Sequence, residues 1–281
     1  MMDGSIISRL GWLRDLPDHR DYSPQHGAVK AALGGLRITE EPSPPRVDWR
    51  EFCPPLQDQQ NLRSSTAHAS AALVQYFVRR ATGKKIFPSR RFLYKTTRSL
   101  LHRTGDTGAD LRTTFKATKR FGLPPEDYFP YEIARYEETP PAFLYSFVGG
   151  LGSVLYLRLD PPGSTGHEVL KAVKAHLSAG FPSVFGFTVH NSLSQEPDIP
   201  FPTTFTSVLG GQAVVTVGYD NERRIRSCKG ALLIRNSWGT AWGEEGYGWL
   251  PYTYVEERLA VDFWTLLRRD WLDSGEFFRP S

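Results

Sequence analysis

The stretch DQQNLRSSTAHA, residues 58–69, leads from a proline-bounded loop into a segment with the composition of a helix. Ser65 would stand at the start of that helix, where unpaired backbone N–H groups and the helix dipole favour negative charge. A serine hydroxyl is a weak nucleophile and needs a neighbouring general base. The first question is therefore whether the chain supplies one.

Histidine is the usual general base, and the chain has seven. His68 lies one turn after Ser65 on the same helical face, but we interpret it as a core histidine. His190 ends the run FGFTVH and could line a groove, although a structural or solvent-facing role is more common. The histidines at 102, 167 and 176 have no partner spacing, and the adjacent Glu137 and Glu138 suggest an exposed surface.

Helical signals dominate the first half of the chain. The run STAHASAALVQYFVRR begins at Ser65 and is followed by Gly83, which predicts a buried helix. Further helices are predicted near 89–102 and 110–121, the latter closing at Gly122 before two prolines. Residues 1–46 are rich in Pro, Gly and charge, without sustained periodicity, and are predicted to form an N-terminal arm.

Strand signals dominate beyond residue 150. Four β-branched or aromatic runs at 153–159, 182–189, 212–220 and 231–237 are bounded by turn residues, and one helix is predicted near 166–179. The proline-rich stretch 194–207 should overhang this part and help to shape a binding site. The predicted organisation is an arm (1–46), a mainly helical lobe (47–148), a sheet-rich lobe (149–265) and a tail (266–281).

Several motifs follow one another in an order that resembles the papain-like cysteine peptidases. They are VDWREF, DQQNLRSSTAHA, GGQAVVTVGYD and IRNSWGTAWGEEGYGWLPY, and the last is the most specific. GWLRDLPDHRDY, FPSRRFLY, FPSVFGFTV and VDFWT look like the bacterial branch of that family. The resemblance covers about residues 11–265 and implies an α+β, papain-like fold in which a helical lobe and an antiparallel, barrel-like sheet lobe form one domain.

The resemblance also assigns roles to four positions. The family uses a cysteine thiolate, a histidine base, an asparagine that orients the histidine and a glutamine that donates to the oxyanion. The matching positions here carry Ser65, Gln212, Asn236 and Gln59, respectively. A glutamine amide does not accept a proton at neutral pH, so cysteine-peptidase activity is not expected. An engineered Ser65 would leave Gln212 unexplained.

The loop before the helix departs from the family pattern as well. Two of its glycines are replaced by Gln60 and Arg63, which predicts backbone strain and a shifted oxyanion site. The resemblance places further residues along the groove between the lobes. Those expected to contact a ligand there are Gln60, Arg63, Ser64, Gly211, Trp238 and His190.

Two functional hypotheses from different classes remain open. The first is a pseudopeptidase that uses the interlobe groove to bind a peptide, protein or small ligand. The second is a repurposed non-hydrolytic catalyst, such as a cyclase of secondary metabolism, that orients a substrate with the neutral cluster of Gln59, Ser65, Gln212 and Asn236. The cluster could also be a relic whose amides satisfy one another.

Composition and charge indicate which classes of binding partner to expect. The chain of 281 residues has 34 Lys and Arg against 30 Asp and Glu, a net charge of +4 that creates no strong field. A basic run at 79–103 is predicted to be a solvated helix face, so no nucleic-acid partner is expected. Neither a signal sequence nor a membrane span is recognisable, which predicts a cytoplasmic protein. Cys53 and Cys228 lack metal-ligand spacing, and no metal or cofactor is predicted. The sequence leaves the oligomeric state open.

Overall fold

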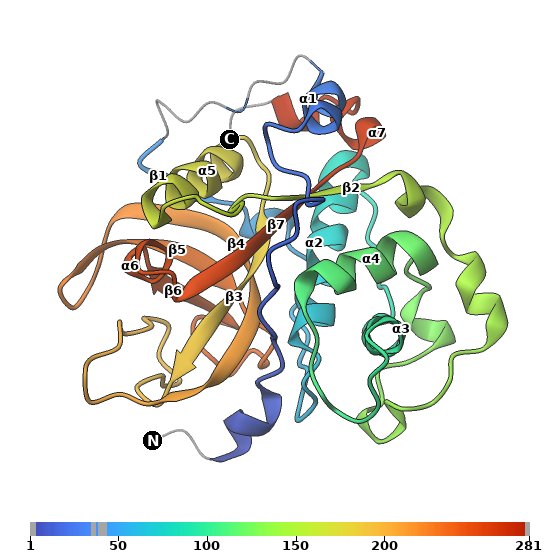
Figure 1. Ribbon diagram of the computed structural model, residues 1–281, viewed down its shortest axis with the longest axis horizontal. Coiled ribbons are helices and arrows are strands. Elements are labelled where there is room, and N and C mark those ends of the chain that lie inside the picture. The colour runs from blue at the N-terminus through green and yellow to red at the C-terminus, as the bar shows by residue number, and fades with distance from the viewer. Residues whose placement is uncertain (1–3, 35–37, 39–43, 279–281) are drawn as a thin grey trace.

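The computed structural model describes residues 4–34, 38 and 44–278. Within them a helical lobe lies beside a sheet lobe, with the N-terminal segment running between the two (Figure 1). The predicted α+β two-lobe fold is confirmed.

The helical lobe contains α2 (Ser65–Thr82), α3 (Arg90–Leu100) and α4 (Leu111–Phe121), within two residues of the predicted bounds. Gly83 ends α2 in the left-handed conformation, with φ 69°, and donates to the carbonyl of Arg79. The side chains of Ser89 and Asp110 cap the N-termini of α3 and α4. The caps and the C-terminal glycine thus fix the ends that the sequence indicated.

The sheet lobe is one antiparallel sheet in the order β2-β7-β3-β4-β5-β6, with β1 paired to β4. Four strands overlap the predicted runs: β2 (Leu155–Arg158), β3 (Ser183–His190), β4 (Val208–Ile225) and β5 (Cys228–Arg235). The strands β1 (Arg46–Asp48), β6 (Tyr247–Pro251) and β7 (Ala260–Leu267) complete it. The helix α5 (Gly166–Ser178) begins with a capping box between Thr165 and Glu168.

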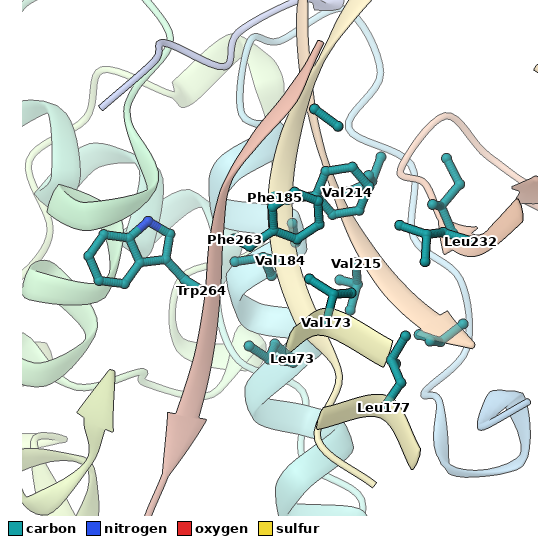
Figure 2. Packing of buried hydrophobic residues seen from close by; sticks show 14 of the residues in the cluster. Leu73, Val173, Leu177, Val184, Phe185, Val214, Val215, Leu232, Phe263 and Trp264 are labelled. Carbon is teal, nitrogen blue, oxygen red and sulfur yellow. The ribbon is translucent and has the colours of Figure 1, made fainter. Parts of the chain in front are cut away.

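The main core joins α2 and α5 to the sheet. Leu73 of α2 and Val173 of α5 converge on β3 and β4 (Figure 2). Beside them the rings of Phe185 and Phe263 stack with centroids 4.4 Å apart. Because protein interiors are close-packed, the packing of Leu73 in this core fixes α2 against the sheet.

Shorter elements frame the two lobes. They are η1 (Gly4–Arg9), α1 (Gly27–Leu33), η2 (Arg50–Phe52), η3 (Glu126–Tyr128), η4 (Ile133–Arg135), η5 (Ala142–Ser146), η6 (Gly149–Ser153), α6 (Thr253–Glu256), α7 (Arg269–Leu272) and η7 (Glu276–Phe278). The excursion at 194–207 runs along β6, where Ile199 and Trp249 exchange a backbone hydrogen bond.

Two features at the lobe boundaries were not predicted from the sequence. The N-terminal arm contains a helix, α1, which His26 caps and Val29 anchors by burial. Residues 46–48, at the boundary between the predicted arm and the predicted helical lobe, form β1 and pair with β4 of the sheet. Part of the arm, residues 35–37 and 39–43, lies outside the described residues.

The expectation of a solvated basic face at 79–103 is wrong for four of its six arginines, Arg80, Arg90, Arg91 and Arg98, which are buried. Arg90, Arg91 and Arg98 are buried and form ion pairs with Glu126, Glu138 and Glu137. The acidic partners come from residues 126–138, outside the run itself. No helix in the described part of the chain is long and apolar enough to cross a membrane.

Candidate functional site

Three of the four candidate residues form one buried hydrogen-bond cluster between the lobes. The amide nitrogen of Gln212, in β4, donates to Gln59 Oε1 and to Asn236 Oδ1, each at 2.9 Å. Ser237 joins them, because its hydroxyl donates to Gln59 Oε1 at 2.7 Å. Gln59 and Gln212 are fully buried. The cluster is uncharged, and its amides satisfy one another only in part, because Gln212 Oε1 and Asn236 Nδ2 have no hydrogen-bond partner.

Ser65 begins α2 and is fully buried. Its hydroxyl oxygen accepts a hydrogen bond from the backbone N–H of Ala213 at 3.3 Å. This is its one hydrogen bond within the described chain. The neighbouring side chain in β4, Gln212, presents amide protons to its partners and offers no basic nitrogen. Gln212 therefore supplies no general base for the Ser65 hydroxyl.

His68 is not a substitute base. Its Nδ1 lies 3.2 Å from the Ser64 hydroxyl and 3.1 Å from the Ser64 carbonyl, and its ring meets Tyr131 edge-on. Complete burial lowers the pKa of His68 to about 3, so the ring is neutral and only weakly basic at physiological pH. The prediction of a core histidine is confirmed.

Both side-chain amide protons of Gln59 are used in hydrogen bonds within the protein. Its nitrogen donates to the carbonyl oxygens of Arg9 and Leu62, both at 2.8 Å. In the resembling peptidases this position would donate to an oxyanion. Here both protons are already used, one of them by the N-terminal segment.

That segment bridges the two walls of the groove with main-chain hydrogen bonds. Trp12 N–H donates to the Gly211 carbonyl of β4 at 3.1 Å. On the helical side Ala109 N–H donates to the Gly11 carbonyl at 2.9 Å, and Leu13 N–H donates to the Ala109 carbonyl at 3.0 Å. The chain thus pairs with both lobes as a bound peptide would.

Three glycines make room for this crossing. A Cβ on Gly186 would fall 1.9 Å from the indole of Trp12, and one on Gly211 would fall 2.4 Å from the same ring. On the other wall, a Cβ on Gly11 would fall 2.1 Å from the carbonyl oxygen of Arg63. Side chains at these positions are incompatible with the segment as it lies.

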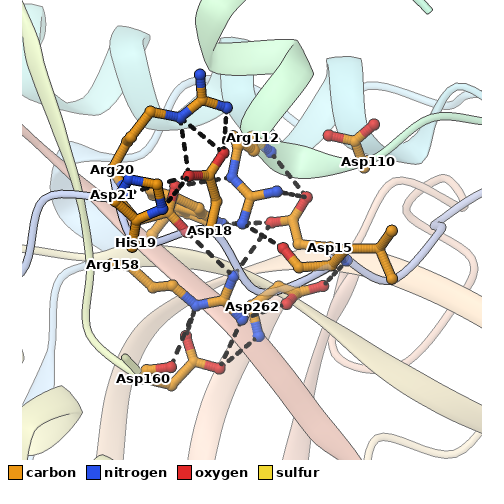
Figure 3. A network of polar contacts seen from close by, with 12 residues as sticks. Asp15, Asp18, His19, Arg20, Asp21, Asp110, Arg112, Arg158, Asp160 and Asp262 are labelled. Atoms are coloured by element: carbon orange, nitrogen blue, oxygen red, sulfur yellow. Dashed lines mark hydrogen bonds and ion pairs between the residues drawn. The ribbon is translucent and has the colours of Figure 1, made fainter. Parts of the chain in front are cut away.

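Further along, a buried charge network fastens the segment to both lobes (Figure 3). Asp15 accepts from Trp264 Nε1 at 2.8 Å, and its own N–H donates to Asp262 at 2.8 Å. Arg158 donates to Asp262 at 2.6 Å, and Arg112 of α4 binds Asp21 at 2.7 Å. Burial, together with the Asp262 charge, raises the pKa of Asp15 to about 8.

Asp262, which accepts the hydrogen bond from Asp15, has a strained backbone conformation. Its φ is +60°, a value that non-glycine residues seldom adopt, at an irregularity in the pairing of β3 and β7. The distortion coincides with the hydrogen bond that Asp262 accepts from Asp15. The strain is therefore found where the sheet anchors the N-terminal segment.

The loop before α2 behaves partly as predicted. Gln60 has φ 52°, so the left-handed backbone expected of a glycine is retained with a side chain present. Arg63 has no such strain, and its N–H donates to Asp106. The expected shift of the oxyanion site stays a prediction.

A small cavity lies behind the cluster, with a volume of roughly 10 Å³, enough for about one water. His68, Asn236 and Ser237 are among the residues that line it. The buried atoms His68 Nε2, Asn236 Nδ2 and Gln212 Oε1 have no hydrogen-bond partner. Among the described residues no group of His, Cys, Asp or Glu is arranged to hold a metal ion.

Two residues expected to line the groove pack inside the sheet lobe in this structure. Trp238 is buried and packs edge-on against Trp242, and His190 is buried against Tyr254. Sequence reasoning missed Ser237, Tyr131 and the segment at 9–13. Ser237 was detectable as the neighbour of Asn236, whereas Tyr131 and Trp12 lie far away in sequence and reach the site only through the fold.

Comparison with known proteins identifies the family. Residues 43–257 match the papain family of cysteine proteases. The chain is 31% identical over 284 residues to the uncharacterized peptidase C1-like protein L477 of Acanthamoeba polyphaga mimivirus, covering 94% of this chain and 89% of that protein. The chain belongs to the papain family.

Solved structures agree. The crystal structure of xylellain, a cysteine protease from Xylella fastidiosa, matches with a TM-score of 0.75 and 32% identity, covering 92% of this chain and 96% of that one. Bromelain from Ananas comosus, in complex with the E64 inhibitor, matches with a TM-score of 0.58 at 18% identity, which supports the fold alone.

Proposed function

We propose that this papain-family protein is a pseudopeptidase, without cysteine-protease activity, whose interlobe groove recognises an extended peptide or protein segment. The observation that carries the proposal is the state of Gln212, whose amide protons are donated to Gln59 and Asn236. A residue in that condition cannot take a proton from Ser65, and a serine hydroxyl without a base is not an effective nucleophile.

The groove supports peptide recognition because the chain already uses it in this way. Gly11, Trp12 and Leu13 make three backbone hydrogen bonds that reach both walls. Such main-chain bonds accept many sequences, while the glycine-lined space around the Trp12 ring would select a side chain. A partner segment would take the place of residues 10–13.

The repurposed-catalyst hypothesis is less well supported. The cavity beside Asn236 and Ser237 has room for about one water. Pockets that bury a small organic ligand are larger, with volumes of about 300–1,000 Å³. A substrate could reach the cluster only after the N-terminal segment had moved.

The first experiment tests inactivity. The full chain is incubated with a fluorogenic peptide library under reducing conditions, beside an active papain-family enzyme. We expect neither turnover nor labelling by a thiol-directed epoxide at position 65. Turnover that disappears in Ser65→Ala would refute the proposal.

The second experiment tests recognition. A peptide display library is screened against the wild-type chain, Trp12→Ala and a control, Leu16→Ala, whose side chain in the same segment is 80% exposed. We expect Trp12→Ala to select peptides with an aromatic anchor that a synthetic peptide of residues 7–16 displaces. Failure of all three proteins to select peptides would remove recognition from the proposal and leave inactivity untouched.

A further inference from the structure

A second cavity lies outside the groove, on the far side of the N-terminal segment. Its volume is roughly 300 Å³. One wall is α4, which contributes Arg112, Lys116 and Lys119; a second is Tyr156 of β2; the third is the N-terminal segment at residues 18 and 20–22. Figure 3 shows several of these residues around Arg112.

The cationic wall follows from helical spacing. Positions 112, 116 and 119 are separated by four and three residues, so their side chains lie on one face of α4. Arg112 is engaged by Asp21, with a contact of 2.7 Å. Lys116 and Lys119 have no ion-pair partner anywhere in the described chain, which leaves two ammonium groups uncompensated beside the cavity.

The charge balance of the lining is positive. Arg20, Arg112, Lys116 and Lys119 give four positive charges against the two carboxylates of Asp18 and Asp21, so the excess is 4 − 2, or two. Each carboxylate already pairs with an arginine, Asp18 with Arg20 at 2.6 Å and Asp21 with Arg112. The surplus is therefore carried by the two lysines.

Two hydroxyl groups complete the lining. The phenols of Tyr22 and Tyr156 face the same cavity, and neither has a hydrogen-bond partner among the described residues. A surface on which two ammonium groups and two phenols are unoccupied presents mainly donors. Its complement is a compact acceptor with about two negative charges.

We propose that this pocket binds the dianionic phosphate group of a small phosphate monoester. A phosphate supplies three acceptor oxygens and about two negative charges, which match the surplus of the lining. Lysine ammonium groups bind phosphate as point charges. The cavity volume lies at the lower end of the range for small-molecule sites and leaves space for a small organic group.

An ordinary solvated helix face would account for the lysines alone. It would not account for the cavity, which the N-terminal segment builds by lying opposite α4 and closing against Tyr156. The ion pair between Arg112 of α4 and Asp21 joins that opposite wall to the helix. The site thus depends on the same segment that crosses the groove, but it lies apart from the former catalytic positions.

The test is isothermal titration of the full chain with inorganic phosphate and, separately, with glycerol phosphate, at low ionic strength and about pH 8, where both are dianions. We expect saturable binding with a Kd of about 1 mM or tighter, weakening as salt is added. Lys116→Met with Lys119→Met should reduce the affinity at least tenfold. The control is Lys84→Met with Lys85→Met, which removes the same charge from exposed positions beyond α2.

The titrations distinguish an organic phosphate monoester from free phosphate as the ligand, and either from no binding. Tighter binding of glycerol phosphate identifies an organic monoester as the ligand, and equal binding identifies the phosphate group as sufficient. Absence of saturable binding to either compound overturns the proposal, as does equal loss of affinity in the control pair. Thermal unfolding of each variant verifies the fold, and because both pocket lysines lie at the surface of α4, no loss of stability is expected.

Discussion

The packing of Trp12 against Gly186 gives a quantitative test of how the N-terminal segment occupies the groove. In Gly186→Ala the added Cβ would lie 1.9 Å from Trp12 Cε2 and 2.1 Å from Cδ2. Real Cβ atoms do not approach a ring so closely, and the ring is rigid. The indole must therefore leave its site or the strand must bend.

The expected loss of stability, as free energy of unfolding, follows from the two ways of relieving the clash. Overpacking a well-packed site costs about 1–3 kcal/mol. Complete loss of the indole contact, as in Trp12→Ala, costs about 3 kcal/mol, at the low end of the range for large aromatic truncations because Trp12 is only partly buried. In Trp12→Ala the obstacle to the new methyl group is gone. We expect the double variant to be no less stable than Trp12→Ala alone, a coupling of about 2 kcal/mol.

The assay is urea unfolding followed by far-ultraviolet circular dichroism, which does not depend on the tryptophan removed. The control is Gly27→Ala, where an added Cβ meets nothing within 4 Å and the change should be close to neutral. Additive costs in the Trp12 and Gly186 cycle would show that the indole does not fill this site, and the account of the groove as occupied by residues 10–13 would fail.

Three further predictions concern the site and its anchor. Because the pKa of Asp15 is raised above its unfolded value, the stability that Asp15 contributes is complete below about pH 4 and is lost as pH rises through about 8. Unfolding midpoints of the wild-type chain should therefore fall over this pH range relative to those of Asp15→Asn. Parallel plots of midpoint against pH for the two proteins would contradict this assignment. The pKa of His68 is lowered, so the dependence on pH is reversed: the stability that neutral His68 contributes is present above about pH 6.5 and is lost towards pH 3. In the same assay, the unfolding midpoint of His68→Gln should fall less steeply with acid than that of the wild-type chain. Ser65→Cys with Gln212→His should give at most weak peptidase activity in a fluorogenic assay, since Gln59 donates both amide protons to carbonyl oxygens; activity equal to that of an ordinary family member would refute this.

The fold could be predicted because its signals are local. α2, α3 and α4 have caps or C-terminal glycines within a few residues of their ends. The central strands are β-branched runs between turn residues. β1, β6 and β7 were not predicted as strands. Three residues at 46–48 form a strand only through pairing with β4, and β6 lies inside a motif that is rich in glycine. β7 contains Asp262, whose positive φ interrupts the regular strand.

The candidate site was predictable in its residues but not in its bonding. The match to family motifs located Gln59, Ser65, Gln212 and Asn236, and three of these share hydrogen bonds. No sequence pattern indicated that Gln59 would donate to the carbonyl of Arg9, fifty positions earlier. Contacts between distant segments depend on the packed fold, which local propensity does not describe.

The glutamine at position 212 and the N-terminal segment are connected through Gln59. Gln59 accepts from Gln212 with its oxygen and donates to Arg9 with its nitrogen, so one amide joins the β4 cluster to the segment that covers the groove. An imidazole at 212 would still donate to Gln59 or Asn236, but with one N–H in place of two amide protons, and the shared arrangement would lose a hydrogen bond. A buried polar group left unpaired costs about 1–3 kcal/mol, and the segment is held by its main-chain bonds and the Asp15 network as well as by Gln59. On the proposed function, a partner peptide must therefore first displace the segment that Gln59 holds.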